Sequence, residues 1–138
     1  MTNPSTIAHE LAATGHPAHA DSVLDAGALA RLVELDPRGQ NHLLERVFQA
    51  FHTSAARLMP QLETARLAGD RQGIRFVAHT LKSSSQSIGA LRLSQCCVLV
   101  ESMVRLDAVD GLDAAIADMG SAMADALRAI DALPKGPP

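Results

Sequence analysis

The chain has 138 residues and a formal net charge of −3, and 47% of its residues are apolar while only 2% are aromatic. These values argue against a nucleic-acid-binding protein, because phosphate contacts need clustered basic side chains and base stacking needs aromatic rings. The sequence has no run of about 18 apolar residues that would span a membrane, and its polar N-terminus lacks the pattern of a signal peptide.

The length suits one domain with a single modest core. Ala and Leu dominate the sequence, and their aliphatic side chains favour an all-α bundle over a sheet. The two cysteines, Cys96 and Cys97, are adjacent, which rules out an ordinary disulfide between them and fits a reducing cytoplasm. No further Cys or His lies near them at metal-ligand spacing, so we expect no metal site.

In chain order, residues 1–20 are small and polar and are predicted to form a flexible tail. A short helix is predicted over residues 25–35, and a turn follows it. The second helix is predicted from an N-cap at Asn41 to residue 68. Its apolar residues recur in steps of four and three, the spacing of left-handed bundle packing: Leu44, Phe48, Phe51, Ala55, Leu58, Leu62 and Ala65.

Pro60 lies inside this second helix, where it removes one backbone hydrogen bond. The helix either bends there or breaks into two, and a bend is favoured because the apolar seam keeps its phase across the proline. Gly69 and Asp70 are predicted to end this helix and to cap the next one. The third helix then carries His79 and ends at Gly89, a residue suited to the left-handed position after a helix.

Two more helices are predicted over residues 91–106 and 112–133, and residues 134–138 are predicted to form a flexible tail. The connections between the last four helices are short, which favours antiparallel neighbours. The predicted domain therefore spans residues 21–133. Its fold is an antiparallel up-down four-helix bundle with a short N-terminal capping helix.

The third predicted helix carries a histidine on a polar stripe opposite an apolar face. At about 100° per residue, Lys82, Ser83 and Gln86 all fall within roughly 60° of His79. The apolar residues of this stretch fall on the other side: Ile74, Val77, Ala78, Leu81 and Ile88. We therefore expect a core that anchors the helix from behind and an imidazole that faces water.

Phosphoryl transfer to an imidazole needs side chains of the kinds found on this stripe. A neutral ring nitrogen is the nucleophile, and a cation one turn away, here Lys82, offsets the charge of the phosphoryl oxygens. Gln86 can donate an amide hydrogen bond, Ser83 leaves room for a partner, and Arg75 adds positive potential at the rim. A histidine on a helix is nevertheless most often a solvated surface residue, so the spacing alone is weak support for a function.

Residues 75–101 resemble the signature of the histidine phosphotransfer (HPt) domain family. The signature is an Ala-His-x-Leu-Lys-Gly/Ser-Ser-Ser/Ala run, followed by Gly-Ala, Leu-Ser, a Cys and an apolar-Glu pair. These motifs appear here at residues 78–85, Gly89-Ala90, Leu93-Ser94, Cys97 and Val100-Glu101. Ser83 stands where Gly is commoner, and Val100 replaces the usual Leu. The similarity extends from about residue 22 to residue 133.

This resemblance implies a phosphorelay intermediate that takes a phosphoryl group from a receiver-domain aspartyl phosphate and passes it to another receiver's aspartate. His79 would be phosphorylated on its outward Nε2, Lys82 would steady the phosphoryl group, and Gln86 would assist. The residues predicted to contact the partner are Arg75, Phe76 and Ser83. The chain would have no kinase activity and no cofactor of its own, since it contains no nucleotide-binding motif, and Mg²⁺ would belong to the receiver.

The expected partners are response-regulator receiver domains and a hybrid sensor histidine kinase. Because the apolar seams are used inside the bundle and no further apolar face stands out, we expect a monomer. Two other functions stay open. One is a helical adaptor that binds a receiver or kinase without phosphotransfer, and the other is the HPt substrate domain of a larger hybrid sensor kinase.

Other residues that could carry chemistry are expected to play no part in it. The histidines of the N-terminal tail could suggest a metal cluster, but a tail interrupted by Pro and Gly more simply leaves them unengaged: His9, His16 and His19. His42 and His52 are expected at the surface. Glu101 is also expected at the bundle surface, where it helps to position a neighbouring helix and has no catalytic role.

Two pairs of residues have a structural interpretation. Ser84 and Ser85 are predicted to hydrogen-bond a backbone carbonyl one turn back, as serines inside helices commonly do. Met119 and Met123 are predicted to fill the core and not to bind a ligand.

Overall fold

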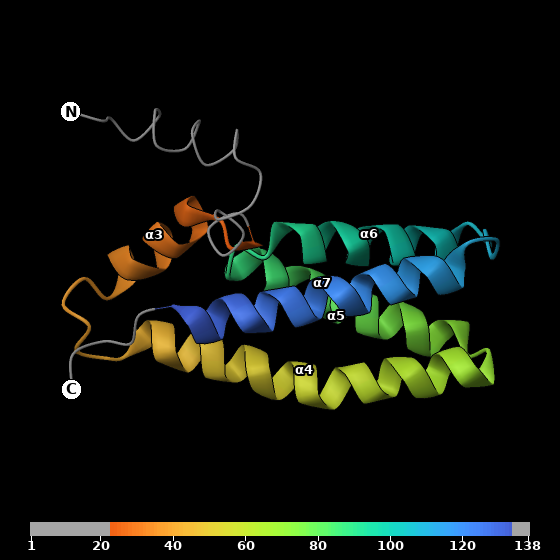
Figure 1. The fold of residues 1–138 in the computed structure, drawn as a ribbon, viewed down its shortest axis with the longest axis horizontal. Coiled ribbons are helices and arrows are strands. Elements are labelled where there is room, and N and C mark those ends of the chain that lie inside the picture. The colour runs from red at the N-terminus through yellow and green to blue at the C-terminus, as the bar shows by residue number, and fades with distance from the viewer. Residues whose placement is uncertain (1–22, 134–138) are drawn as a thin grey trace.

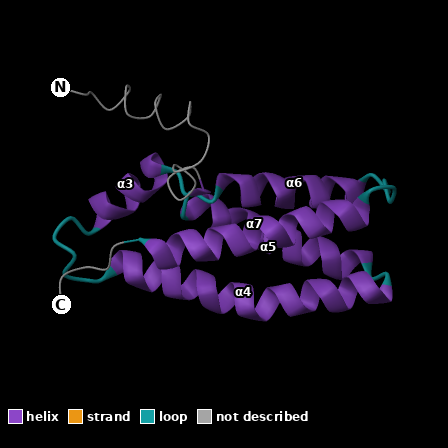
Figure 2. Cartoon of the chain, in the orientation of Figure 1, coloured by secondary structure: helices purple, strands orange, loops and turns teal. Residues whose placement is uncertain are grey.

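The structure, a computed structural model, describes residues 23–133. This part of the chain forms five helices and no strand: α3 (Ala26–Leu35), α4 (Leu43–Ala68), α5 (Arg71–Ser87), α6 (Leu91–Arg105) and α7 (Leu112–Ala132). Figure 2 shows these helices and the loops that join them. The tails predicted at 1–20 and 134–138, and with them the three tail histidines, lie outside the described residues.

Helices α4 to α7 lie along the long axis of the molecule, and α3 lies at one end of the bundle (Figure 1). Helix α5 packs against α4 and α6, while α7 packs against α6 and α4, so the four helices close around one core. Their short connections make successive helices antiparallel. The predicted all-α, antiparallel four-helix bundle with a short N-terminal helix is confirmed.

The core is built from the apolar faces that the sequence predicts. The apolar residues of the α5 stretch are all exposed by 3% or less: Ile74, Val77, Ala78, Leu81 and Ile88. The α4 seam is buried from Phe51 to Ala65, and Met119 and Met123 of α7 lie in the same core. Because these side chains interdigitate, α5 cannot rotate about its axis, and its opposite face is held toward solvent.

The start of α4 differs from the prediction. Asn41 is not the N-cap: the N-cap is His42, which has a left-handed backbone with φ of 53° and makes no side-chain cap hydrogen bond. Asp36 caps the helix instead, because its Oδ2 accepts from the backbone N–H groups of Asn41 and Leu43, each at 3.1 Å. The prediction was wrong because the capping carboxylate comes from the preceding turn and not from a residue next to the helix.

Pro60 lies inside α4, which runs unbroken from Leu43 to Ala68, so the alternative of two separate helices is wrong. The helix ends at Gly69, whose φ of 66° is left-handed. Asp70 then caps α5 by accepting a hydrogen bond from the backbone N–H of Gly73 at 3.0 Å. Both helix ends at this connection were predicted from the sequence.

The connection between α5 and α6 hydrogen-bonds to the residue before α3. Gly89 has φ of 79°, and its carbonyl accepts a hydrogen bond from the backbone N–H of Asp25 at 2.7 Å. A Cβ on residue 89 would lie 2.7 Å from that same nitrogen, so this position needs a glycine. Leu24 is only 2% exposed next to this contact. The N-terminal end of α3 is therefore fixed beside the first turn of α6.

Helix α6 has a buried face and an exposed apolar face. Leu93, Cys97 and Val100 are buried as predicted, and Val104 is only partly covered. Four other large apolar side chains stay exposed: Leu91 (45%), Val98 (44%), Leu99 (51%) and Leu106 (67%). The expectation that no further apolar face exists was therefore wrong. Gln95, Ser102 and Arg105 lie on the same side of α6 as these four residues, so the side is mixed in character and no regular apolar period marks it in the sequence.

Candidate functional site

His79 lies near the middle of α5 on the face that turns away from the core. Its neighbour Ala78 is fully buried, whereas 65% of the His79 side chain is exposed. The imidazole therefore faces solvent, as the helical pattern predicts. A packed helix holds it there, so a large partner can reach a ring whose position is fixed.

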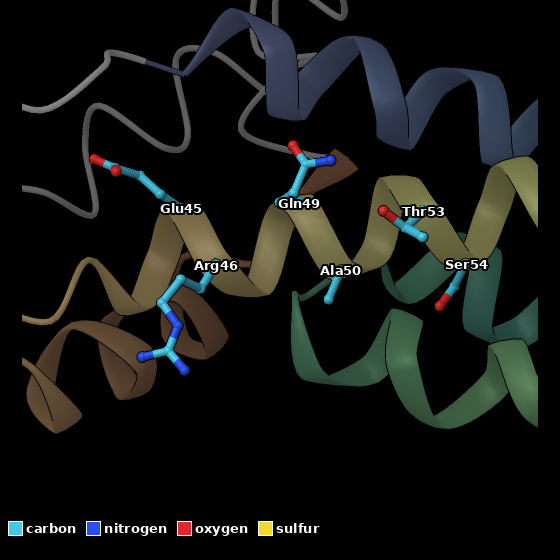
Figure 3. A pocket seen from close by; sticks show the side chains of 6 residues that line it. All are labelled: Glu45, Arg46, Gln49, Ala50, Thr53 and Ser54. Carbon is cyan, nitrogen blue, oxygen red and sulfur yellow. The ribbon is translucent and has the colours of Figure 1, made fainter.

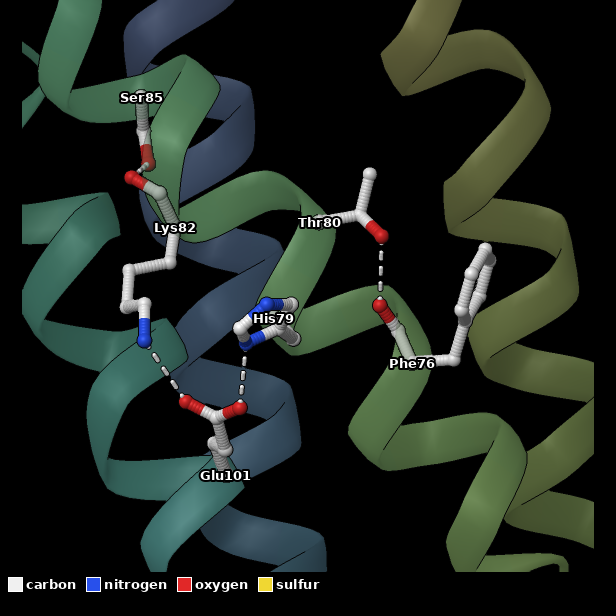
Figure 4. Close-up of polar contacts among 6 residues, drawn as sticks. All are labelled: Phe76, His79, Thr80, Lys82, Ser85 and Glu101. Atoms are coloured by element: carbon white, nitrogen blue, oxygen red, sulfur yellow. Dashed lines mark hydrogen bonds and ion pairs between the residues drawn. The ribbon is translucent and has the colours of Figure 1, made fainter.

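One carboxylate joins His79 to the neighbouring helix α6. The Nδ1 atom of His79 lies 2.7 Å from Oε2 of Glu101. The other oxygen of the same carboxylate, Oε1, accepts a hydrogen bond from Nζ of Lys82 at 2.9 Å. Figure 4 shows the Glu101 carboxylate between the two side chains of α5. The three residues form a connected group, the His79–Glu101–Lys82 triad.

The carboxylate of this triad is sheltered and ionised. Glu101 is 15% exposed, less than Lys82 at 28% and far less than His79. The hydrogen bond from the Lys82 ammonium lowers the pKa of the Glu101 carboxyl below its ordinary value, and the contact with His79 acts in the same direction, although burial opposes both. Glu101 therefore carries a negative charge at neutral pH.

The ionised carboxylate determines which ring nitrogen of His79 can react. A carboxylate only accepts hydrogen bonds, so Nδ1 must carry the proton that it donates to Glu101. In a neutral imidazole the other nitrogen, Nε2, then holds the free lone pair. Within residues 23–133 the only hydrogen-bond partner of the ring is Glu101, on Nδ1. The geometry thus presents Nε2 of His79 as an exposed nucleophile.

The contacts of Glu101 with the other two residues of the triad were not predicted from the sequence. Glu101 was expected at the bundle surface with only a helix-positioning role, whereas its carboxylate contacts both His79 and Lys82. The contact joins residues 22 positions apart on two helices, which periodicity within one helix cannot reveal. The one signal in the sequence was the apolar-Glu pair of the family signature, Val100-Glu101.

The other predicted site residues lie on the same exposed side of α5. Arg75, Ser83 and Gln86 are exposed, and Phe76 is 56% exposed. In Figure 4 the Phe76 ring lies on the side of α5 that faces α4, away from Glu101. None of these four side chains hydrogen-bonds to the triad among the described residues. They surround His79 as a rim that is open to a partner.

The two other histidines of the bundle are arranged differently. His42 is 66% exposed and lies 3.3 Å from Glu45 of the same helix. His52 of α4 contacts Oδ1 of Asp131 of α7 through its Nε2 at 3.1 Å, and it is 33% exposed. Both histidines lie at or near the surface as predicted. Among the described residues, neither partner carboxylate, Glu45 or Asp131, also contacts a lysine.

The predictions for the two serines inside α5 and for the adjacent cysteines are confirmed. The hydroxyl of Ser84 donates to the Leu81 carbonyl at 3.3 Å, and that of Ser85 donates to the Lys82 carbonyl at 3.1 Å. Both cysteines are free, and burial raises the pKa of the Cys97 thiol to about 12. Cys97 is therefore a neutral core residue at physiological pH.

A surface hollow on α4 is lined by none of the residues of the His79–Glu101–Lys82 triad. A shallow hollow of about 650 Å³ lies along the N-terminal half of α4 (Figure 3). It is lined by Glu45, Arg46, Gln49, Ala50, Thr53 and Ser54. Residues 23–133 also include no group of three or more His, Cys, Asp or Glu that could hold a metal ion. No helix in this part of the chain is long and apolar enough to cross a bilayer.

A helical bundle that presents a fixed, exposed histidine is the arrangement of a phosphotransfer domain, and the comparisons with known proteins agree. The family model described as Hpt domain matches residues 46–133. Histidine-containing phosphotransfer protein B from Pseudomonas aeruginosa PAO1 is similar with 27% identity and a TM-score of 0.66, over 79% of this chain and 91% of that one.

A rice protein described as a histidine-containing phosphotransfer protein shares the fold, with a TM-score of 0.69 and 19% identity over 92% of both chains. The comparison with curated proteins found no significant match. Since the family model covers more than half of the sequence, the chain belongs to the Hpt domain family. It is a phosphotransfer intermediate of a two-component phosphorelay, and its partners are of the receiver-domain kind.

Proposed function

We propose that Nε2 of His79 accepts a phosphoryl group from an aspartyl phosphate on one receiver domain and passes it to the aspartate of another. The observation that carries this proposal is the hydrogen bond between Nδ1 of His79 and Glu101 at 2.7 Å. It directs the free lone pair to Nε2 on a side chain that is 65% exposed.

The transfer step forms one bond and breaks one. The Nε2 lone pair attacks the phosphorus, and the phosphorus–oxygen bond to the receiver's aspartate breaks, which releases the aspartate as a carboxylate. Positive charge develops on the imidazole as the N–P bond forms. The anionic Glu101, in contact with the opposite ring nitrogen, stabilises that charge. Transfer to the second receiver reverses these steps.

Lys82 has two functions in this proposal. In the free protein its ammonium bonds Glu101 and so keeps the carboxylate charged and oriented. When a phosphoryl group arrives on His79, which lies one helical turn away, the same ammonium can turn toward the phosphoryl oxygens and offset their charge. Gln86 adds a neutral hydrogen-bond donor on the same side of α5.

The rim around His79 supplies the contact with the receiver. Arg75 and the exposed ring of Phe76 lie on one side of the histidine, and Ser83 follows it on the next turn with a side chain small enough to let a partner approach. We further propose that the chain works in the cytoplasm as a monomer, and that a hybrid sensor histidine kinase carries the donor receiver. Mg²⁺ belongs to the receiver's site, and this chain brings no cofactor of its own.

A phosphotransfer assay tests the proposal. The chain is incubated with a receiver domain that has been phosphorylated on its aspartate and then separated from the donor. We expect an adduct on this chain that is labile in acid and stable in base, as a phosphoramidate bond is. If the receiver binds the chain but transfers no phosphoryl group, the chain is the non-catalytic adaptor and the proposal is wrong.

A further inference from the structure

The side-chain hydroxyl groups in the second half of α5 are used in two different ways. Four of them donate to backbone carbonyls of the same helix, as hydroxyls inside helices commonly do: Thr80, Ser84, Ser85 and Ser87. The hydroxyl of Ser83, which lies among them, makes no hydrogen bond to another group within residues 23–133. Ser83 is exposed, so α5 keeps one hydroxyl donor free at its surface.

This free hydroxyl lies on the same face of α5 as the ring of His79. Ser83 comes four residues after His79, so the two Cβ atoms lie about 5–6 Å apart, one above the other on the helix. Side chains on a helix lean toward its N-terminus, and the Ser83 side chain therefore leans toward the turn that carries His79. By the same rule the side chain of Arg75, one turn earlier, leans away from the ring.

The other donor one turn after His79 is already engaged. Nζ of Lys82 bonds the Glu101 carboxylate at 2.9 Å, and the ammonium must give up or share this contact to reach a phosphoryl group. The free ring nitrogen of His79 lies on the side of the imidazole away from Glu101 (Figure 4). A hydroxyl at residue 83 can bind a phosphoryl oxygen there without breaking any contact of the free protein.

We propose that the hydroxyl of Ser83 donates a hydrogen bond to the phosphoryl group on His79 and so stabilises the phosphorylated chain. This inference rests on the proposed function, because it needs a phosphohistidine at residue 79. The hydroxyl takes part in no covalent step and adds no charge, and its hydrogen bond is strengthened because the acceptor is anionic. A glycine, the commoner residue of the family at this position, would leave the phosphoryl group without this donor.

The position of the transfer equilibrium separates this role from a contact between Ser83 and the receiver. A contact made only in the complex changes the forward and reverse transfer rates by the same factor, so the equilibrium between the free proteins stays where it was. A hydrogen bond to the phosphoryl group persists after the receiver has left. It therefore shifts the equilibrium toward the phosphorylated chain.

Forward and reverse transfer rates with one receiver domain test the proposal. Phosphorylated receiver is mixed with the full chain, and phosphorylated chain is mixed with unphosphorylated receiver. Ser83→Ala should shift the ratio of the two rates about three- to tenfold toward the phosphorylated receiver, as expected for one lost hydrogen bond. Ser83→Gly should shift it in the same direction, although alanine favours a helix and glycine disfavours it.

Ser87→Ala is the matched control. This serine is also exposed on α5, but its hydroxyl already donates to the Ser83 carbonyl at 3.1 Å and it lies two turns beyond His79. The same substitution there should leave the ratio of the rates unchanged.

Three results would overturn the inference and leave the proposed function in place. One is a wild-type ratio in both Ser83 variants. The second is opposite shifts in Ser83→Ala and Ser83→Gly, which would trace the effect to helix propensity. The third is an equal shift in Ser87→Ala. Failure of the wild-type chain to take up a phosphoryl group from any receiver would overturn the proposed function as well.

Discussion

His79 and His52 each contact a carboxylate on a neighbouring helix, but the two pairs are built in opposite ways. His79 is 65% exposed and its partner Glu101 is 15% exposed, whereas His52 is 33% exposed and its partner Asp131 is 69% exposed. His79 uses Nδ1 for the contact and His52 uses Nε2. In the His79 pair the carboxylate is sheltered and the ring is exposed. In the His52 pair the ring is the more sheltered group and the carboxylate is exposed.

The comparison indicates what distinguishes His79, the proposed phosphoryl acceptor, from another surface histidine. A carboxylate within hydrogen-bond distance is present in both pairs, so it is not sufficient by itself. The His79 pair also has a lysine that holds the carboxylate, since Nζ of Lys82 lies 2.9 Å from Glu101. Together with the exposed Nε2, this third residue separates the two sites, and the variants below test each difference.

The largest expected effect is that of replacing the His79 ring, and the same replacement at His52 is its control. His79→Gln should abolish phosphoryl transfer from a phosphorylated receiver, because the amide has no nucleophilic ring nitrogen. His52→Gln should transfer at a rate within about twofold of the wild type, since surface substitutions away from the site change little. Gel separation of the phosphorylated chain measures both. Labelling of His79→Gln at the wild-type rate would remove His79 from the mechanism.

The next largest effect is expected at the Glu101 carboxylate, and Asp131 provides its control. Glu101→Gln keeps the shape of the side chain but removes its charge, and a hydrogen bond to a charged group contributes roughly 1.5–3 kcal/mol. We expect transfer to slow by about 10- to 100-fold. Asp131→Asn makes the matched change in the His52 pair and should have no effect on the rate. If the two variants behave alike in single-turnover transfer, the Glu101 contact has no role in the chemistry.

A smaller effect is expected at Lys82. Lys82→Ala should slow transfer by about tenfold and leave the fold intact, because its side chain is partly exposed. Part of the loss should act through Glu101, so the same substitution should cost less in a Glu101→Gln background. Rates of the two single variants and the double variant form the cycle. Strictly additive losses would mean that Lys82 acts on the phosphoryl group alone.

The smallest effect concerns stability in acid. The pKa of Glu101 is lowered in the folded chain, so its charge stabilises the fold at pH values above the unfolded pKa, near 4.3, and this contribution is lost as the pH falls through the lowered value. The free energy of unfolding should therefore decline less steeply below about pH 4 in Glu101→Gln than in the wild type. Urea denaturation between pH 6 and 3 measures the slopes, and identical slopes would contradict the inferred shift.

The sequence was sufficient where a structural feature depends on neighbours along one helix. The buried face of α5, the connection at Gly69-Asp70 and the left-handed Gly89 were all predicted, because periodicity, side-chain capping and backbone conformation are local properties. Pro60 was also placed inside a continuous helix, since the apolar seam keeps its phase on both sides of it.

The sequence failed where a feature depends on contacts between elements. The Asp36 carboxylate caps α4 from seven residues away, and Glu101 reaches His79 from another helix. The exposed face of α6 was missed for a related reason. Which face of a helix remains uncovered depends on where its neighbours pack, and a pattern within the helix does not contain that information.

The most direct test of the central claim is to locate the phosphoryl group on the ring. The chain is labelled with ¹⁵N-histidine, phosphorylated by a receiver and examined by ¹⁵N and ³¹P NMR. We predict a single phosphohistidine, at His79, with phosphorus bonded to Nε2 and the proton kept on Nδ1. Phosphorus on Nδ1 of His79, or on another histidine, would contradict the account.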